Sequence, residues 1–254
     1  MTMPEISLKQ NNSFSRKPMP IILPHILMVQ RDESFSPNAV EKDLAILQAV
    51  GEKLRERGAS VSYVKEELLQ DKRWKLGDRV SVIFSMARSE KSLAVLQQAQ
   101  AEGVMVVNDP RSIEICNSRR AIDGLMRSNR IPAAPYYERG KGWIKADRGH
   151  DVRFAANEEE MLAFKQQVED PLLTAHVEGT LVKFYGVADR FFSPQGYPQV
   201  AEAAARLARL VGIQVYGGDA VLLSDGTFAI IDFNDWPSFS SCREEAAAAI
   251  CRLI

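Results

Sequence analysis

Cysteine, histidine, long apolar runs and an excess of either charge are all scarce in this sequence. Its three cysteines show no CxxC spacing and its three histidines no HExxH motif, so we expect reduced thiols and no zinc site. Lys and Arg total 32 against 33 Asp and Glu, which leaves no basic field for a polyanion, and we expect no nucleic-acid partner. Apolar runs are strand-sized and the N-terminus lacks a signal-peptide pattern, which predicts a cytoplasmic protein without membrane contact.

The common phosphate-binding and hydrolytic motifs are also missing. No GxGxxG follows the first strand-like run, and neither GxxxxGK[ST] nor GxSxG occurs in the 254 residues. These absences argue against a plain dinucleotide-binding domain, a P-loop nucleotide hydrolase and a serine hydrolase with a nucleophile elbow. Any chemistry must therefore come from a different arrangement of residues.

The first part of the chain alternates strand-like apolar runs with helical patterns. After the run at 25–30, a helix is expected with Ser36 as its N-cap and Pro37 as its first residue. Residues 21–108 as a whole predict an α/β layer with an open, largely parallel sheet. The turn-forming residues at 108–110 mark the expected domain boundary, and the polar residues 1–20 are expected to form a flexible tail.

The second part, residues 109–254, mixes helices with short strands and predicts an α+β domain. An alanine-rich amphipathic helix is expected at about 199–211 and a β-hairpin within 216–239. The predicted fold class is thus α/β plus α+β.

The hairpin carries the strongest local signal. Asp225 and Gly226 predict a two-residue turn, which needs positive φ at both positions. Counting outward from that turn places Asp219 directly opposite Asp232, and Asn234 lies two residues further on the same face. The pattern therefore brings two carboxylates and one amide together at the end of an apolar hairpin.

Directly opposed carboxylates destabilise a sheet unless something compensates their charge. A hard divalent cation is the obvious compensation, because carboxylate and amide oxygens suit Mg²⁺ or Mn²⁺. Mg²⁺ commonly completes its shell with phosphate oxygens, so the pattern also predicts a nucleoside triphosphate. The alternative interpretation is that Asp219 and Asp232 are solvated ends of an exposed hairpin.

These residues resemble the signature of the ATP-grasp superfamily, in which an acid precedes a hairpin and an acid-x-Asn follows it. Asp219, Asp232 and Asn234 match those three positions and would hold the metal. The stretch 107–137 is similar to the family's segment in which a basic residue begins a helix, a position offered here by Arg119 or Arg120. The resemblance implies a Rossmann-like domain over 21–108 and an ATP-grasp domain over 109–254, with an abbreviated lid at about 132–177.

The resemblance also implies a set of nucleotide-binding residues. Lys145 matches the family's phosphate-contacting lysine, the loop 148–151 matches its mobile loop, and 172–179 matches its adenine-binding hinge. Leu181 stands where the family often has the acidic residue that contacts ribose. The implied binding residues are Arg119, Lys145, Arg148, Gly149, His150, Thr174, Ala175 and Val177. Lys183 and Arg190 are our candidates for catalysis, Arg190 by stabilising the transferring phosphoryl group or an anionic acceptor.

The expected function is an ATP- and Mg²⁺-dependent ligase that activates a carboxylate as an acylphosphate for attack by an amine or similar nucleophile. A small-molecule kinase similar to the inositol phosphate kinases is one alternative, and a nucleotide-binding module without turnover is another. The expected partner is a small anionic acceptor, and a homodimer is a reasonable default.

Overall fold

The computed structural model describes residues 24–194 and 196–254, so the tail predicted at 1–20 lies outside the described residues. The N-terminal part is built on a parallel sheet of four strands in the order β2-β1-β3-β4. Its strands are β1 (His25–Gln30), β2 (Ser60–Lys65), β3 (Val80–Ser85) and β4 (Met105–Val107). The expectation of an open parallel sheet is confirmed.

Helices cover both faces of this sheet because the residues of β1 point alternately to either side. Ile26 and Met28 pack in the same cluster as α1 (Val40–Glu56), whereas Leu27 and Val29 pack with α3 (Glu90–Ala101). The short α2 (Glu66–Leu69) lies on the α3 side through Leu69. Ser89 is the N-cap of α3, and its hydroxyl oxygen accepts a hydrogen bond from the Ser92 amide.

The helix expected from Pro37 begins later, at Val40. A 3₁₀ turn, η1 (Glu33–Phe35), comes first and is capped by the Asp32 side chain. The Ser36 hydroxyl does not cap a helix, because it accepts a hydrogen bond from Arg31 Nη1 at 3.2 Å. A contact within the loop, from Arg31 to Ser36, thus takes the place of the helix cap that the sequence predicted.

The C-terminal part contains an antiparallel sheet in the order β11-β10-β8-β9. Its strands are β8 (Thr180–Val187), β9 (Arg190–Phe192), β10 (Val215–Leu222) and β11 (Phe228–Asp235). Buried residues of α5 (Arg119–Ser128) and α7 (Pro198–Val211) share one apolar cluster with β10 and β11. The remaining helices are α4 (Pro110–Cys116) and α8 (Arg243–Ile250).

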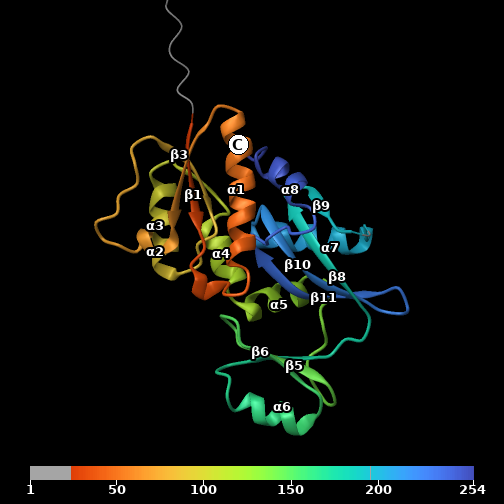
Figure 1. Ribbon diagram of the computed structural model, residues 1–254. Coiled ribbons are helices and arrows are strands. Elements are labelled where there is room, and N and C mark those ends of the chain that lie inside the picture. Colours follow the sequence, from red (N-terminus) through yellow and green to blue (C-terminus); the bar gives the residue numbers. More distant parts are fainter. Residues whose placement is uncertain (1–23, 195) are drawn as a thin grey trace, which may run out of the picture.

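A smaller sheet in the order β6-β5-β7 projects from the rest of the molecule, with α6 (Glu158–Lys165) on its outer side (Figure 1). Its strands are β5 (Gly142–Lys145), β6 (Val152–Ala155) and β7 (Leu172–Ala175). Ile144 packs against Met161 of α6, so the alternation of β5 turns Lys145 to the opposite face, toward the core of the molecule. We call residues 142–175 the lid. The short strands β6 and β9 were not predicted from the sequence.

The hydrophobic core continues across the boundary predicted at 108–110. One buried cluster contains residues of β1, β3 and α1 together with residues of β8, β10 and α8. The fully buried side chain of Asn108 also donates to the Val215 carbonyl at 2.7 Å and accepts from the Val215 amide. The two parts are therefore held in a fixed relation through shared apolar contacts and a buried amide.

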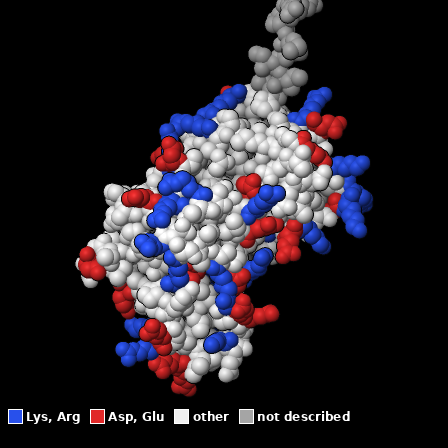
Figure 2. Space-filling view, turned by 180° about the vertical axis from the view of Figure 1, so that it is seen from behind, with Lys and Arg blue, Asp and Glu red and all other residues white. Residues whose placement is uncertain are grey.

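Charges of both signs are interspersed over the face of the molecule shown in Figure 2, in keeping with the net charge of −1. Within the described residues, no helix combines the length and apolarity that crossing a bilayer requires.

We predict that Gly186→Ala destabilises the protein by about 1–3 kcal/mol, because the added Cβ would overlap the ring of Tyr216, which is 1% exposed. The matched control is Gly124→Ala in α5, where a Cβ would meet nothing within 4 Å among the described residues. That change should stabilise the helix by about 0.5–1 kcal/mol. Urea unfolding measures both, and equal stability of the two variants would contradict the prediction.

Candidate active site

The hairpin of β10 and β11 places Asp219 opposite Asp232, as predicted. The turn itself differs from the expected one. Leu223 N donates to Thr227 O at 2.8 Å, which leaves three residues in the loop, and only Gly226 has positive φ. A three-residue loop of this kind carries its left-handed residue at the third position, where glycine is favoured.

A β-bulge restores the predicted register. Between the pair Asp219–Asp232 and the pair Ala220–Ile230, Ile231 is left without a partner on β10. The longer turn and the bulge each shift the pairing by one residue, in opposite senses, so their effects cancel at the acids. Lys145 Nζ donates to the carbonyl oxygen of Ile231 at 2.7 Å. This hydrogen bond connects the lid strand β5 to the bulge of the hairpin. β-Bulges are often found next to active sites.

Each acid has a polar neighbour of its own. Lys183 stands opposite Asp219 on β8, and its Nζ lies 3.0 and 3.3 Å from the two carboxylate oxygens. Burial acts to lower the pKa of Lys183, but the Asp219 carboxylate outweighs this effect and raises that pKa. Asn234 Nδ2 donates to Asp232 Oδ2 at 2.6 Å, which leaves Asn234 Oδ1 available as an acceptor.

Two cavities, of about 440 and 490 Å³, meet at these residues. The first, which we call the lid cavity, is lined by Lys145 and Thr174 from the lid and by hydrophobic residues of α5. The second, which we call the crevice cavity, is lined by Lys183 and Asp219 and by the residues after β1. Both are lined by Phe35, Arg88, Arg119, Gly149, His150, Asp232 and Asn234.

The sequence offered either Arg119 or Arg120 as the basic residue of the site, and the structure distinguishes between them. Arg119 lines both cavities and donates to the carbonyls of Ala146 at 2.6 Å and Gly149 at 2.9 Å. Arg120 instead pairs with Asp170 at 2.5 Å, on the surface. Burial lowers the pKa of Arg119 and of Lys145 below their ordinary values, an effect that the Asp232 carboxylate partly offsets in both.

The loop 146–151 connects the lid to the N-terminal part. His150 Nε2 lies 2.8 Å from the Ser34 carbonyl oxygen, and Arg148 lies 3.6 Å from Glu90. These contacts place Arg148, Gly149 and His150 along the lid cavity, together with Lys145 and Arg119. Cationic side chains and a loop backbone therefore converge beside the acids.

Three predicted site residues are not brought to the cavities. Thr174 lines the lid cavity, but Ala175 and Val177 are missing from the described residues that line either cavity. Arg190 is missing too. It pairs with Val187, the last residue of β8, whereas Asp219 pairs with Lys183 in the middle of that strand. Arg190 is exposed there. The structure thus gives no geometric support for a catalytic role of Arg190.

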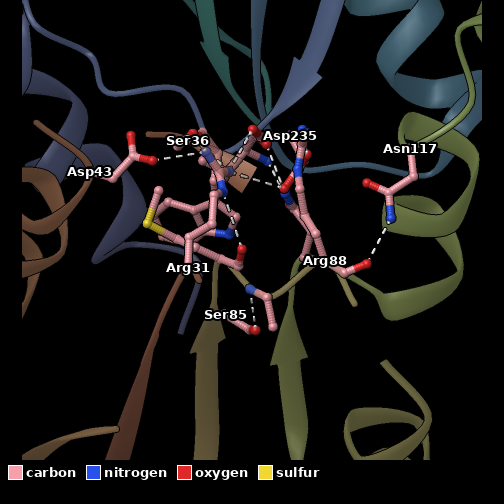
Figure 3. Close-up of polar contacts among 12 residues, drawn as sticks. Arg31, Ser36, Asp43, Ser85, Arg88, Asn117 and Asp235 are labelled. Atoms are coloured by element: carbon pink, nitrogen blue, oxygen red, sulfur yellow. Dashed lines mark hydrogen bonds and ion pairs between the residues drawn. The ribbon is translucent and has the colours of Figure 1, made fainter. Parts of the chain in front are cut away.

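A buried charge cluster lies beside the acids and is centred on Asp235, a residue that the sequence analysis did not single out. Asp235, 1% exposed, accepts hydrogen bonds from both Arg31 and Arg88, which approach it from two sides (Figure 3). Arg31 also pairs with Asp43 of α1 at 2.9 Å. Burial alone would raise the pKa of Asp235, but the two guanidinium groups outweigh it and hold the pKa below the ordinary 3.8. The sequence signal was available, since the two arginines closely follow parallel strands, where sites form.

Within the described residues, no group of three or more His, Cys, Asp and Glu side chains is arranged to hold a metal ion. The candidate metal ligands are two carboxylates and one amide oxygen. That donor set suits a hard cation that takes its remaining ligands from water or phosphate. The residues present therefore fit a magnesium ion bound together with a nucleotide.

We predict that Asp235→Asn costs about 3–5 kcal/mol of stability, because it leaves two buried guanidinium groups without their shared carboxylate. The control is Asp170→Asn, which breaks an ion pair whose side chains are 45% and 73% exposed and should cost at most about 1 kcal/mol. Denaturant unfolding at neutral pH measures the difference. A loss at Asp235 no greater than at Asp170 would show that the buried cluster contributes no special stability.

No family model matches the sequence, and no curated protein matches it. The structure, however, is similar to several solved structures. D-alanine–D-alanine ligase from Bacillus anthracis superposes with a TM-score of 0.69 at 9% identity, over 90% of this chain and 96% of that one. The RimK domain ATP-grasp protein from Sphaerobacter thermophilus gives 0.67 at 14%, over 91% and 99%. The ATP-grasp ligase PsnB, complexed with the precursor peptide PsnA2 and AMPPNP, gives 0.64 at 17%, over 92% and 98%.

These matches extend over nearly the whole of each chain and agree with the acid pattern of the hairpin. At such low identity they establish the architecture and not the activity. The chain has the ATP-grasp fold.

Proposed function

We propose that this protein is an ATP- and Mg²⁺-dependent ligase that activates a carboxylate for attack by an amine or similar nucleophile. The observation that carries the proposal is the position of Asp232 and Asn234 at the junction of two cavities. The lid cavity is lined by the cations that a triphosphate needs, and the crevice cavity is available for an acceptor. Phosphoryl transfer requires this combination of positioning and charge stabilisation more than covalent help from the protein.

The nucleotide is assigned to the lid cavity. Lys145 and Arg119 would contact the phosphates, because both cations line the cavity and interact electrostatically with Asp232. Arg148, Gly149 and His150 would close over the phosphates from the loop that already reaches the N-terminal part. Thr174 lines the same cavity, so the adjoining hinge at 175–177 is the proposed neighbour of the base.

Asp219, Asp232 and Asn234 would hold Mg²⁺, or Mn²⁺ in its place. The ion would supply positive charge beside the transferring phosphoryl group. Lys183 donates to the Asp219 carboxylate and would turn to the phosphates or the acceptor where a metal ion takes its place on that carboxylate. Solved structures with a similar fold include complexes with ATP and with Mg and ADP. This similarity supports the proposal that the protein uses ATP and Mg²⁺.

The proposed reaction has two steps. The acceptor carboxylate attacks the γ-phosphorus in line, the bond from γ-phosphorus to the bridging oxygen breaks, and ADP leaves. An amine then attacks the acylphosphate carbon, phosphate leaves, and the amine loses a proton. The cations around the junction of the cavities stabilise the charge that develops on the phosphoryl oxygens.

We predict that Asp232→Asn lowers the Mg²⁺-dependent rate of ADP formation by at least about 100-fold, since one ligand charge is worth several kcal/mol in such a site. Asp225→Asn is the matched control, because Asp225 lies in the turn of the same hairpin and bonds only to Thr227. ADP release is measured against a panel of carboxylates with amines, and separately of polyols. Phosphate release that requires two co-substrates supports a ligase, whereas a phosphorylated polyol would indicate a kinase.

The buried lysine gives a second prediction, on pH. Burial lowers the pKa of Lys145, and Arg119 adds to the effect, while Asp232 opposes it. Only the protonated amine attracts phosphate, so nucleotide affinity should decline as pH rises through a pKa below the ordinary 10.5. Lys145→Arg should move this decline to higher pH, because a guanidinium stays charged throughout. Binding of AMPPNP with Mg²⁺ measured from pH 7 to 10 tests this, and identical profiles would refute it.

A further inference from the structure

The N-terminal sheet has a topological switch point between β1 and β3. From β1 the chain passes to β2 on one side and then to β3 on the other, so the connections diverge at the carboxyl ends of these strands. Open α/β sheets bind ligands in the crevice at such a point. Arg31 directly follows β1, and Arg88 lies three residues after β3. Both line the crevice cavity.

The two arginines are used differently. Arg31 is saturated, since its N–H groups donate to the carbonyls of Met86 and Trp236 and to Ser36, Asp43 and Asp235. Arg88 makes a single side-chain contact, from Nη2 to Asp235, and its buried Nε has no partner among the described residues. The Arg88 side chain is 15% exposed and lines both cavities. Arg31 is therefore a structural crosslink, whereas Arg88 has unused donors at the junction.

Arg88 is also held rigidly. Its backbone N–H donates to the fully buried Glu66 at 2.9 Å, and its carbonyl accepts from Asn117 Nδ2 at 2.9 Å. Glu66 takes two further backbone N–H groups, of Asp32 and Ser89, and so fixes the ends of both loops of the crevice. These bonds fix the backbone of Arg88, and the pair with Asp235 holds its guanidinium, so the side chain loses little conformational entropy when it binds a ligand.

We propose that Arg88 binds the carboxylate of the acceptor. A guanidinium has donors only and stays charged, so its unused N–H groups need an acceptor, and a carboxylate matches its planar fork. At the junction, that carboxylate would lie between the crevice cavity and the phosphates, beside Asp232 and Asn234. The inference rests on the proposed function, and it assigns to Arg88 the contact with an anionic acceptor that the sequence suggested for Arg190.

The test uses acetate as the probe, because it carries the carboxylate alone. Ligand-observed NMR measures acetate binding to the full chain saturated with AMPPNP and Mg²⁺, with acetamide as the uncharged isostere. We expect acetate to bind and acetamide not to bind. Replacing Mg²⁺ by Mn²⁺ should enhance relaxation of the acetate methyl protons, which places the probe near the metal. Acetate that fails to bind, or binds without this enhancement, overturns the proposal.

Arg88→Gln should weaken acetate binding at least about tenfold, and by a larger factor than it weakens AMPPNP binding. Arg88→Lys keeps a charge beside Asp235 and thus the fold, but it lacks the fork and should also weaken acetate binding. Arg120→Gln, one residue from Arg119 but paired on the surface, should change neither affinity. Unchanged acetate binding in both Arg88 variants overturns the proposal.

The same measurements separate this inference from the proposed function. If AMPPNP with Mg²⁺ does not bind the parent protein, the proposed function fails, while acetate binding to the nucleotide-free chain still reports on Arg88. If the nucleotide binds and acetate does not respond to Arg88, only the inference fails.

Discussion

The ion pairs of Asp235 with Arg31 and Arg88 are the interaction on which the site depends. Asp235 is the last residue of β11 and directly follows Asn234, whereas the arginines come from the ends of the first and third parallel strands. These pairs therefore lock the acidic hairpin to the crevice of the N-terminal sheet. Because Asp235 is fully buried and both arginine side chains are mostly buried, separation of the two parts would leave poorly compensated charge on both sides. The arrangement of residues at the junction of the two cavities therefore depends on these ion pairs.

Local chemistry explains most of what the sequence could predict. The parallel sheet, the Ser89 cap and the pairing of Asp219 with Asp232 follow from alternation, capping and turn residues. The pairing was right although two local details were wrong, since the longer turn and the bulge at Ile231 cancel. A bulge depends on contacts across the sheet, here including the bond from Lys145 to the Ile231 carbonyl, and such contacts leave no mark in the local pattern.

Long-range geometry explains what could not be predicted. Arg88 and Arg190 look alike in sequence, since each lies in a polar loop beside a strand end. Only the fold shows that Arg88 lies at the switch point, whereas Arg190 follows the last residue of β8 and lines neither cavity among the described residues. Arg119 and Arg120 are adjacent, and the helical rotation between them decides which one meets the lid loop. In each case the sequence shows that an arginine is present, but only the tertiary structure shows whether it lies at the site.

The charges of the free protein also explain why metal and nucleotide should bind together under the proposed function. Asp219 is already neutralised by Lys183, and Asp232 lies near the cations Lys145 and Arg119. A metal ion alone would have to displace Lys183 and would then leave several cations close to one another. A triphosphate supplies the negative charge that these cations lose when the metal takes the carboxylates. The site is therefore nearer to neutral without ligands, or with both of them, than it would be with either ligand alone.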